Sequence, residues 1–293
     1  MSNTTPIRER SFGTHDGTFH ADEVTAAALL LYLNLIDKQA IIRTRDLQQL
    51  ASCEYVCDVG GIYNPDIKRF DHHQVEYKGT FSSAGMVLEY LKTRSIITAS
   101  DYDFLNNSLV RGIDAHDNGR DLQTSGVCTF SHIISNFTPI CYDATTEEQN
   151  RAFFEALAFA LGHIARLLER YRYNQSCKDV VGTAMAEFRD CLIFEKPVPW
   201  MDTFFEQGGE HHPARFVIMP SGTYWKLRGI PPTVDEKMKV RQSLPIEWAG
   251  LSDRNLQQAS GIPGAVFCHK GRFISVWQTK EDALTALQKI LEK

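Results

Sequence analysis

Apolar and polar positions follow a regular order along the first 145 residues. Short, largely apolar runs typical of strands lie at 10–15, 41–45, 55–59 and 68–74. Stretches with helical periodicity lie between the first three of these runs, at 22–37 and 46–52, and after the last, at 82–94 and 103–116. Strands that alternate with helices are typical of a mostly parallel sheet with helices packed against it. We therefore predict an α/β domain over residues 1–145.

The pattern changes twice in the remainder of the chain. Residues 146–190 carry Ala, Glu, Arg and Leu at helical spacing with a break near Asn174, which predicts two long helices. Residues 191–293 hold most of the prolines, short β-type runs at 215–219, 224–227, 265–268 and 273–277, and a terminal helical stretch at 280–291. We expect a helical connector over 146–190 and a smaller α+β domain over 191–293.

Charge limits the classes of partner. The 293 residues carry a formal net charge of −5. This balance argues against broad binding to duplex nucleic acid, which depends on many Lys and Arg contacts to phosphates. A short or single-stranded substrate in a local pocket remains compatible with it.

Other features indicate the compartment. No apolar run approaches the roughly 20 residues that span a bilayer, and residues 1–10 lack the apolar stretch of a secretory signal. We expect a cytoplasmic protein without membrane contact, and its seven cysteines are expected to be reduced thiols. Cys53 and Cys57 have no second cysteine pair to complete a zinc site. The oligomeric state stays open, with a homodimer as one alternative.

Histidines and carboxylates gather in four short segments where predicted strands or helices end, at 13–23, 57–61, 70–74 and 112–119. Taken singly, each segment has a structural explanation as a turn, a helix cap or a polar surface. Together they supply mixed imidazole and carboxylate ligands, which suit Mn²⁺ and similar ions. Because the carboxyl ends of parallel strands share one edge of a sheet, the segments are expected to converge.

These segments also resemble a known family. Gly-Thr-His-x-Gly-x-Phe-His-x-Asp-Glu at 13–23, Asp-Val-Gly-Gly at 58–61, Phe-Asp-His-His-Gln at 70–74 and Asp-x-x-Asp-Asn-Gly at 114–119 are similar to motifs of the melanocyte-proliferating-gene exonuclease family. That family is a branch of the DHH phosphoesterase superfamily. The resemblance extends to 81–85, 248–251 and 261–269.

The resemblance implies two divalent cations, Mn²⁺ first, with Mg²⁺ or Co²⁺ as alternatives. It implies metal ligands at His15, His20, Asp22, Asp58, His72 and either Asp114 or Asp117. Asp58 would bridge the two ions, His73 would face the substrate, and Asp71 would orient its neighbours. His20 stands where most members of the superfamily have an aspartate. Asp16 and Glu23 are polar neighbours with a supporting role.

The resemblance implies that the second domain binds substrate. Its candidate contacts are Gly264, His269, Arg272 and Arg228, with Lys226 and Trp225 beside the last. A plain β-turn with surface charges is the other interpretation of 261–272. The implied activity is two-metal hydrolysis of phosphodiesters by a 3′–5′ exonuclease acting on short or single-stranded RNA or DNA. The alternatives are a phosphohydrolase of pyrophosphate, polyphosphate or a dinucleotide, and a non-catalytic protein that binds metal or nucleotide.

Overall fold

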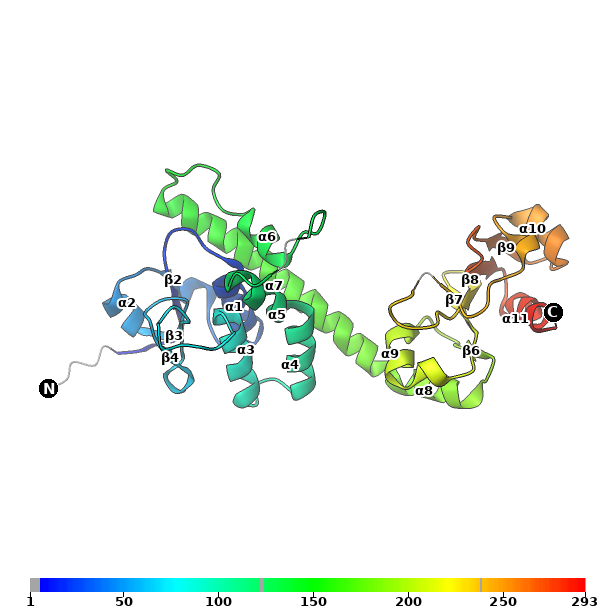
Figure 1. Cartoon of the computed structure of the whole chain (residues 1–293), viewed down its shortest axis with the longest axis horizontal. Coiled ribbons are helices and arrows are strands. Elements are labelled where there is room, and N and C mark those ends of the chain that lie inside the picture. The colour runs from blue at the N-terminus through cyan, green and yellow to red at the C-terminus, as the bar shows by residue number, and fades with distance from the viewer. Residues whose placement is uncertain (1–5, 122–123, 238, 293) are drawn as a thin grey trace. The chain divides into compact units, whose positions relative to one another are not determined.

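The computed structural model describes residues 6–121, 124–237 and 239–292. The chain divides into two units, Met1–Tyr171 and Arg172–Lys293, and the boundary falls within the long helix α7 (Thr146–Ser176). Each unit has its own sheet (Figure 1), and each sheet has five strands. The main core of the first unit and the two cores of the second lie within the separate units. Among the described residues, no helix combines the length and hydropathy of a membrane-spanning segment.

The sheet of the first unit is mostly parallel, as predicted. Its order is β2-β1-β3-β5-β4, in which β1, β2, β3 and β5 run parallel and β4 is an antiparallel edge. The strands are β1 (Arg8–Thr14), β2 (Ile41–Arg43), β3 (Cys53–Cys57), β4 (Tyr63–Asn64) and β5 (Arg69–Phe70). The two-residue β4 was not predicted, since Asn64-Pro65 there marks only the turn that follows.

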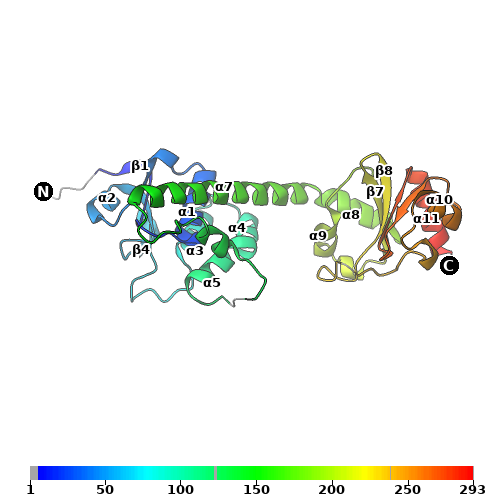
Figure 2. The ribbon, with the colours of Figure 1, turned by 90° about the horizontal axis from the view of Figure 1, so that it is seen from above.

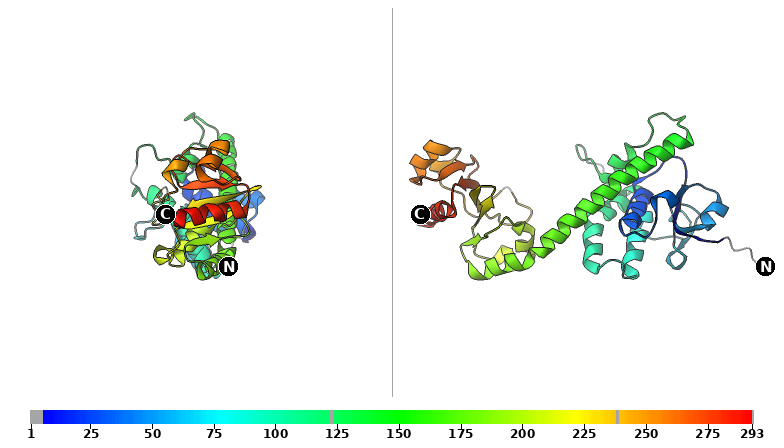
Figure 3. Two further views of the ribbon diagram at one scale, coloured as in Figure 1. Left: turned by 90° about the vertical axis from the view of Figure 1, so that its right-hand side faces the viewer. Right: turned by 180° about the vertical axis from the view of Figure 1, so that it is seen from behind.

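Helices cover both faces of this sheet. One face packs against the main core, and the other carries α2 with a small cluster around Leu50 and Val56. The main core includes one side of α7, the long green helix in Figures 2 and 3. The helices are α1 (Ala21–Tyr32), α2 (Leu47–Ala51), α3 (Ser83–Thr93), α4 (Ala99–Leu105), α5 (Arg111–Asp117), α6 (Phe130–Ser135) and α7, with a π-helical turn at Asn106–Val110 and 3₁₀ turns at Lys38–Ala40 and Pro65–Ile67.

The first long helix ends five residues earlier than the sequence pattern predicts. We expected it to run to Asp37, but α1 stops at Tyr32. Asn34 takes the left-handed conformation, with φ 57°. Its N–H donates to the Leu31 carbonyl and the Leu35 N–H donates to the Leu30 carbonyl, which is the Schellman pattern of a helix end. The apolar residues beyond Asn34 are therefore packed without being helical.

The second unit is a mixed α+β layer, as predicted. Its sheet has the order β6-β7-β8-β10-β9, with only the β6–β7 pair parallel. Figure 2 shows helices on both sides of it. The strands are β6 (Cys191–Ile193), β7 (Phe216–Ser221), β8 (Tyr224–Gly229), β9 (Ala265–Cys268) and β10 (Ile274–Trp277), and the helices are α8 (Lys178–Glu187), α9 (Trp200–Glu206), α10 (Asp253–Ser260) and α11 (Lys280–Leu291), with 3₁₀ turns at Gly209–His211 and Ile246–Trp248.

Two cores hold this sheet. One lies between the sheet and α10 and α11, around Phe216, Leu227 and Trp277. The other lies on the opposite face, where α8 and α9 pack against β6 and β7 through Phe204 and Val217. The terminal helix α11 was predicted at its observed bounds, whereas β6, α9 and α10 were not predicted. These three elements are short, with three, seven and eight residues, so the sequence offers few positions from which to predict them.

Candidate metal centre

Three neighbouring parallel strands of the first unit end at the same edge of the sheet. His15 follows directly after β1, Asp58 directly follows β3, and Asp71 directly follows β5. The first turn of α1 adds Asp22 and Glu23 at this edge. The predicted convergence is therefore present, and it follows from the parallel order β1-β3-β5.

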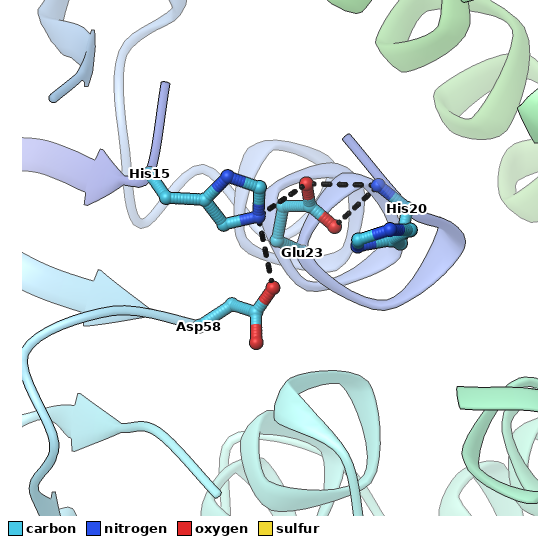
Figure 4. A group of neighbouring side chains, drawn as sticks. All are labelled: His15, His20, Glu23 and Asp58. Carbon is cyan, nitrogen blue, oxygen red and sulfur yellow. Dashed lines mark hydrogen bonds and ion pairs between the residues drawn. The ribbon is translucent and has the colours of Figure 1, made fainter. Parts of the chain in front are cut away.

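His15 is held in one orientation (Figure 4). Its Nδ1 lies 2.9 Å from the Asp16 carbonyl oxygen, and its Nε2 lies 3.1 Å from Asp58 Oδ2 and 3.3 Å from Glu23 Oε1. A backbone carbonyl accepts the proton of Nδ1, so Nε2 presents its lone pair to the cluster in the neutral ring. A second nitrogen fixed in this way is the usual arrangement of a histidine that binds metal.

His72 and His73 approach the same carboxylate from the β5 side. His72 Nε2 lies 3.0 Å from Asp117 Oδ2 and 3.4 Å from Asp58 Oδ1. His73 Nδ1 lies 2.8 Å from Asp71 Oδ1, and its side chain is 63% exposed. Asp71 is itself fixed, because the Gly61 N–H donates to its Oδ2 at 2.6 Å. His72 thus points into the cluster, while His73 stands at its open side.

The donor atoms form three overlapping groups with ligand-like separations. In each group the atoms lie within 4.8 Å of one another. The groups are His15, His20, Glu23 and Asp58; Asp58, His72 and His73; and His20, Asp22 and Asp117. Asp58 and His20 each belong to two groups, so ions bound in neighbouring groups would share ligands.

The cluster is rich in buried carboxylates and poor in fixed cations. Asp22 and Glu23 are fully buried, and Asp58 is almost so. Among the described residues, no Lys or Arg forms an ion pair with Asp22, Glu23, Asp58 or Asp117. The ion-pair partners of the last three are imidazoles, and Asp22 accepts the Ser83 N–H at 3.3 Å. Buried carboxylates without a countercharge are costly, so the site requires protons or cations.

The pKa values reflect this excess of negative charge. Burial opposes the charged form of His15 and His72, yet the facing carboxylates raise the pKa of each to about 10. Burial, together with the charges of Asp58, Glu23 and Asp117, raises the pKa of Asp22 well above its usual range. Burial also opposes ionisation of Asp58, but His15 and His72 hold its pKa below the usual range. Both directions of shift follow from the excess of carboxylates over fixed cations in the cluster.

Several buried polar atoms of the cluster have no hydrogen-bond partner within the described part of the chain. They are Asp22 Oδ1, Asp58 Oδ1 and His72 Nε2. His72 Nε2 and Asp117 Oδ2 approach within 3.0 Å without the direction of a hydrogen bond. Buried groups are normally paired, and unpartnered donors that converge are typical of a site that binds a cation. Nitrogen and oxygen donors of this kind fit a divalent cation of the Mn²⁺ or Mg²⁺ type.

The geometry distinguishes the two aspartates of α5. Asp117 reaches His72 and belongs to the group with His20 and Asp22. Asp114 Oδ1 instead accepts hydrogen bonds from Ser82 N–H at 2.9 Å, from Ser82 Oγ at 2.6 Å and from Gly85 N–H at 3.1 Å. Asp114 thus anchors the start of α3 and lies in none of the three groups.

Some residues contribute more to the site than the sequence predicted. Glu23, expected only in a supporting role, offers a carboxylate to one donor group while accepting the His20 N–H at 3.0 Å. His116 was not predicted; Asp121 Oδ2 lies 2.7 Å from its Nδ1. A cavity of about 280 Å³ is lined by both His116 and the donor cluster. Asp16 contributes through its backbone carbonyl and pairs with Arg45 through its side chain.

The candidate contacts of the second unit are placed as follows. Gly264 is buried before β9, where a Cβ would collide with the Asp282 carboxylate. His269 Nδ1 accepts the Gly271 N–H at 3.0 Å. Arg272 has φ 56° and donates to the Leu244 carbonyl at 3.3 Å. Arg228 lies in β8. Gly264, His269 and Arg272 thus make contacts within the second unit, to α11, to their own loop and to the segment at Leu244.

Comparisons with known proteins found matches over nearly the whole chain. The family model MYG1_exonuc, described as "Uncharacterised protein family (UPF0160)", matches residues 11–291. A MYG1 protein of Chlamydia trachomatis is 51% identical over 284 residues, which cover 97% of each chain. A MYG1 protein of Schizosaccharomyces pombe is 31% identical over 315 residues, covering 95% of this chain and 96% of that one. The MYG1 exonuclease of Homo sapiens is 29% identical over 329 residues, with coverage of 96% and 87%.

Among solved structures, RecJ from Thermus thermophilus in complex with Mn²⁺ aligns with a TM-score of 0.29 and 10% identity. The alignment covers 97% of this chain, which spans about half (52%) of that one. A similarity this low carries no argument about the present chain.

Fold and site together define an α/β protein with a carboxylate–imidazole cluster at the carboxyl edge of a parallel sheet. The family match covers nearly the whole chain, and the chain belongs to the MYG1 exonuclease family. This confirms the resemblance that the four sequence segments indicated.

Proposed function

We propose that this protein is a metal-dependent hydrolase of phosphoester bonds that acts as a 3′–5′ exonuclease on short or single-stranded RNA or DNA. The observation that carries the proposal is the donor cluster, in which Asp58 belongs to two groups and, among the described residues, no Lys or Arg pairs with the carboxylates. Human and mouse relatives that bear the name MYG1 exonuclease support the class of substrate.

Two divalent cations, with Mn²⁺ preferred, would be held by residues of the cluster. The proposed ligands are His15, His20, Asp22, Asp58, His72 and Asp117, with Glu23 beside them. Bound cations of this kind lower the pKa of water and neutralise charge on a phosphoryl group. Asp58 is suited to the shared position because its Oδ2 faces His15 while its Oδ1 faces His72 and His73.

His73 is the residue that we assign to the substrate. Its Nδ1 is held by Asp71, so Nε2 on the exposed side of the ring is free to meet a phosphoryl oxygen. The hydrogen bond that the His73 ring donates to the Asp71 carboxylate raises the pKa of His73, against burial. The protonated ring donates from Nε2 and can also deliver that proton to the leaving oxygen. Asp71 is a positioning residue in this scheme, anchored by the Gly61 N–H.

His116 completes one wall of the substrate cavity in this proposal. Asp121 fixes Nδ1 of its ring, and the ring lines the same cavity as His73 and Asp117. A histidine oriented by a carboxylate presents its other nitrogen in one direction. We assign it a positioning contact to the substrate next to the scissile group.

The deciding experiment is a screen of Mn²⁺, Mg²⁺, Co²⁺ and Zn²⁺ with 3′- and 5′-labelled oligonucleotides of RNA and DNA. The proposal expects mononucleotides to be released stepwise from the 3′ end, with Mn²⁺ most effective and EDTA abolishing release. Pyrophosphate and a dinucleotide serve as parallel substrates.

Each other result corresponds to a different function. Phosphate released from pyrophosphate with intact oligonucleotides would replace the exonuclease by a small-molecule phosphohydrolase. Metal binding without hydrolysis of any phosphoester would replace it by a non-catalytic binding protein.

A further inference from the structure

One face of the sheet in the second unit is only partly covered. On that face α8 and α9 pack against β6 and β7, but no described residue of β8, β9 or β10 belongs to their core. The side chains that alternate onto the uncovered part form what we term the β8–β10–β9 face: Tyr224, Lys226, Arg228, Ile274, Val276 and Phe267.

This face carries two cations that have no carboxylate partner. Lys226 and Arg228 are two residues apart on β8, and both are half-buried. Within the described part of the chain neither forms an ion pair, and the buried Arg228 Nε has no hydrogen-bond partner. Burial and the mutual repulsion of the two charges lower the pKa of Lys226. Partly desolvated cations without a countercharge are costly, so an anionic ligand would explain them.

Apolar and aromatic side chains lie in register with these cations. Lys226 is opposite Val276 on β10, and Val276 is opposite Phe267 on β9. Strands lie about 4.8 Å apart, so Phe267 stands roughly 10 Å from Lys226 across the sheet. The Phe267 ring is 38% exposed and Tyr224, beside Lys226 on the same strand, is 43% exposed. Trp225 alternates to the opposite face, where it packs against the core around Trp277.

We propose that the β8–β10–β9 face binds single-stranded nucleic acid, with phosphates on Lys226 and Arg228 and a base stacked on Phe267. Cations that follow the backbone, combined with exposed aromatic rings for the bases, are the usual elements of such a surface. A sheet face with stacking aromatics is a known platform for single strands. The net charge of −5 is compatible, because the contact is local. This inference deepens the proposed function, on which it rests for the class of substrate.

The test measures binding without catalysis. A fluorescein-labelled 12-nucleotide oligouridylate is titrated with the full chain in EDTA, and anisotropy is followed at several salt concentrations. The variants are the double substitution Lys226→Gln/Arg228→Gln and the single substitution Phe267→Ala. Arg254→Gln on the exposed surface of α10 is the matched control for charge.

We expect the double variant to bind at least about tenfold more weakly, with the slope of log K against log salt reduced by about 1.4 for two lost phosphate contacts. Phe267→Ala should bind at least about fivefold more weakly, with an unchanged salt slope, because stacking is not ionic. Arg254→Gln should match the wild type. Arg228→Lys keeps the positive charge and should keep the salt slope of the wild type. This variant therefore distinguishes a loss of charge from a loss of folding.

Two outcomes would overturn the inference. In one, the double variant binds the oligonucleotide as tightly as Arg254→Gln does. In the other, the double variant binds more weakly but Phe267→Ala binds like the wild type. Hydrolysis of the same oligonucleotide with Mn²⁺ is assayed separately. If the oligonucleotide stays intact but its binding depends on both charges and on Phe267, the proposed function is rejected and this face is kept. If the oligonucleotide is hydrolysed but its binding does not depend on them, this face is rejected and the proposed function is kept.

Discussion

The two units leave opposite charges unmatched. At the sheet edge of the first unit, the buried carboxylates pair with imidazoles and with no Lys or Arg among the described residues. On the open sheet face of the second unit, Lys226 and Arg228 meet no carboxylate within the described ranges. Ordinary folding pairs or exposes such groups, because an uncompensated buried charge costs stability. The comparison supports the ligands that we propose, because a divalent cation would match the carboxylates of the first unit and phosphates would match the two cations of the second.

The substitution with the largest expected effect is Asp58→Asn in the first unit. We expect turnover of an oligonucleotide to fall about a thousandfold or more, since the loss of a shared ligand removes several kcal/mol of metal-assisted stabilisation. The circular dichroism spectrum should remain that of the wild type. Asp103→Asn on the exposed side of α4 is the matched control and should keep full activity. Retention of more than a tenth of the activity by Asp58→Asn would contradict the shared position.

Metal binding should depend steeply on pH. The pKa of His15 and of His72 is raised to about 10, so both hold protons at neutral pH in the metal-free protein. A metal must displace these protons, so affinity should rise by about one to two decades per pH unit between pH 6 and 8.

The stability of the metal-free protein should move in the opposite direction. A group whose folded pKa is raised stabilises most fully below its unfolded pKa of about 6.5, and that stability is lost as pH rises toward 10. The increase in Tm caused by Mn²⁺ should therefore grow from pH 6 to 8, measured by thermal unfolding with Mn²⁺ and with EDTA. An increase that is independent of pH would mean that these imidazoles are not displaced.

The convergence of the segments in the first unit was predictable from the sequence because of a general rule of parallel sheets. His15, Asp58 and Asp71 follow three strands that end together, so their convergence was predictable from segment order. The choice between Asp114 and Asp117 was not predictable, because residues three apart on a helix share one face. That choice depends on the start of α3, some thirty residues earlier, which takes up Asp114.

The second unit was less predictable for a related reason. Alternation along β8 separates Trp225 from Lys226 and Arg228, and this is visible in the sequence. Which face the helices cover depends on α10 and α11, whose residues lie far along the chain. Trp225 was therefore grouped with the two cations, although its ring packs on the covered face.

The aspartates of α5 offer a sharper comparison within the first unit. Asp117→Ala should weaken Mn²⁺ binding at least about tenfold, measured by calorimetry, with little loss of stability in EDTA. Asp114→Ala should do the reverse. It removes three hydrogen bonds at the start of α3 and should lower the free energy of unfolding by about 2 kcal/mol while leaving Mn²⁺ affinity nearly unchanged. Equal effects of both substitutions on Mn²⁺ affinity would place Asp114 in the cluster after all.

The smallest expected effect is a gain in stability, and it concerns the second unit. Lys226→Met keeps an unbranched side chain of similar length and removes a half-buried charge that is repelled by Arg228. The free energy of unfolding should therefore rise by about 0.5–1 kcal/mol in the absence of nucleic acid. Denaturant unfolding of the full chain in EDTA measures it.

Lys239→Met is the matched control, because Lys239 is exposed and pairs with Glu236, so its loss should bring no gain. The gain from Lys226→Met should shrink in 0.5 M salt, which screens the repulsion from Arg228. If Lys226→Met instead destabilises the chain as an ordinary loss of packing, the charge on β8 is matched within the protein. The comparison between the two units would then hold for the acidic site alone.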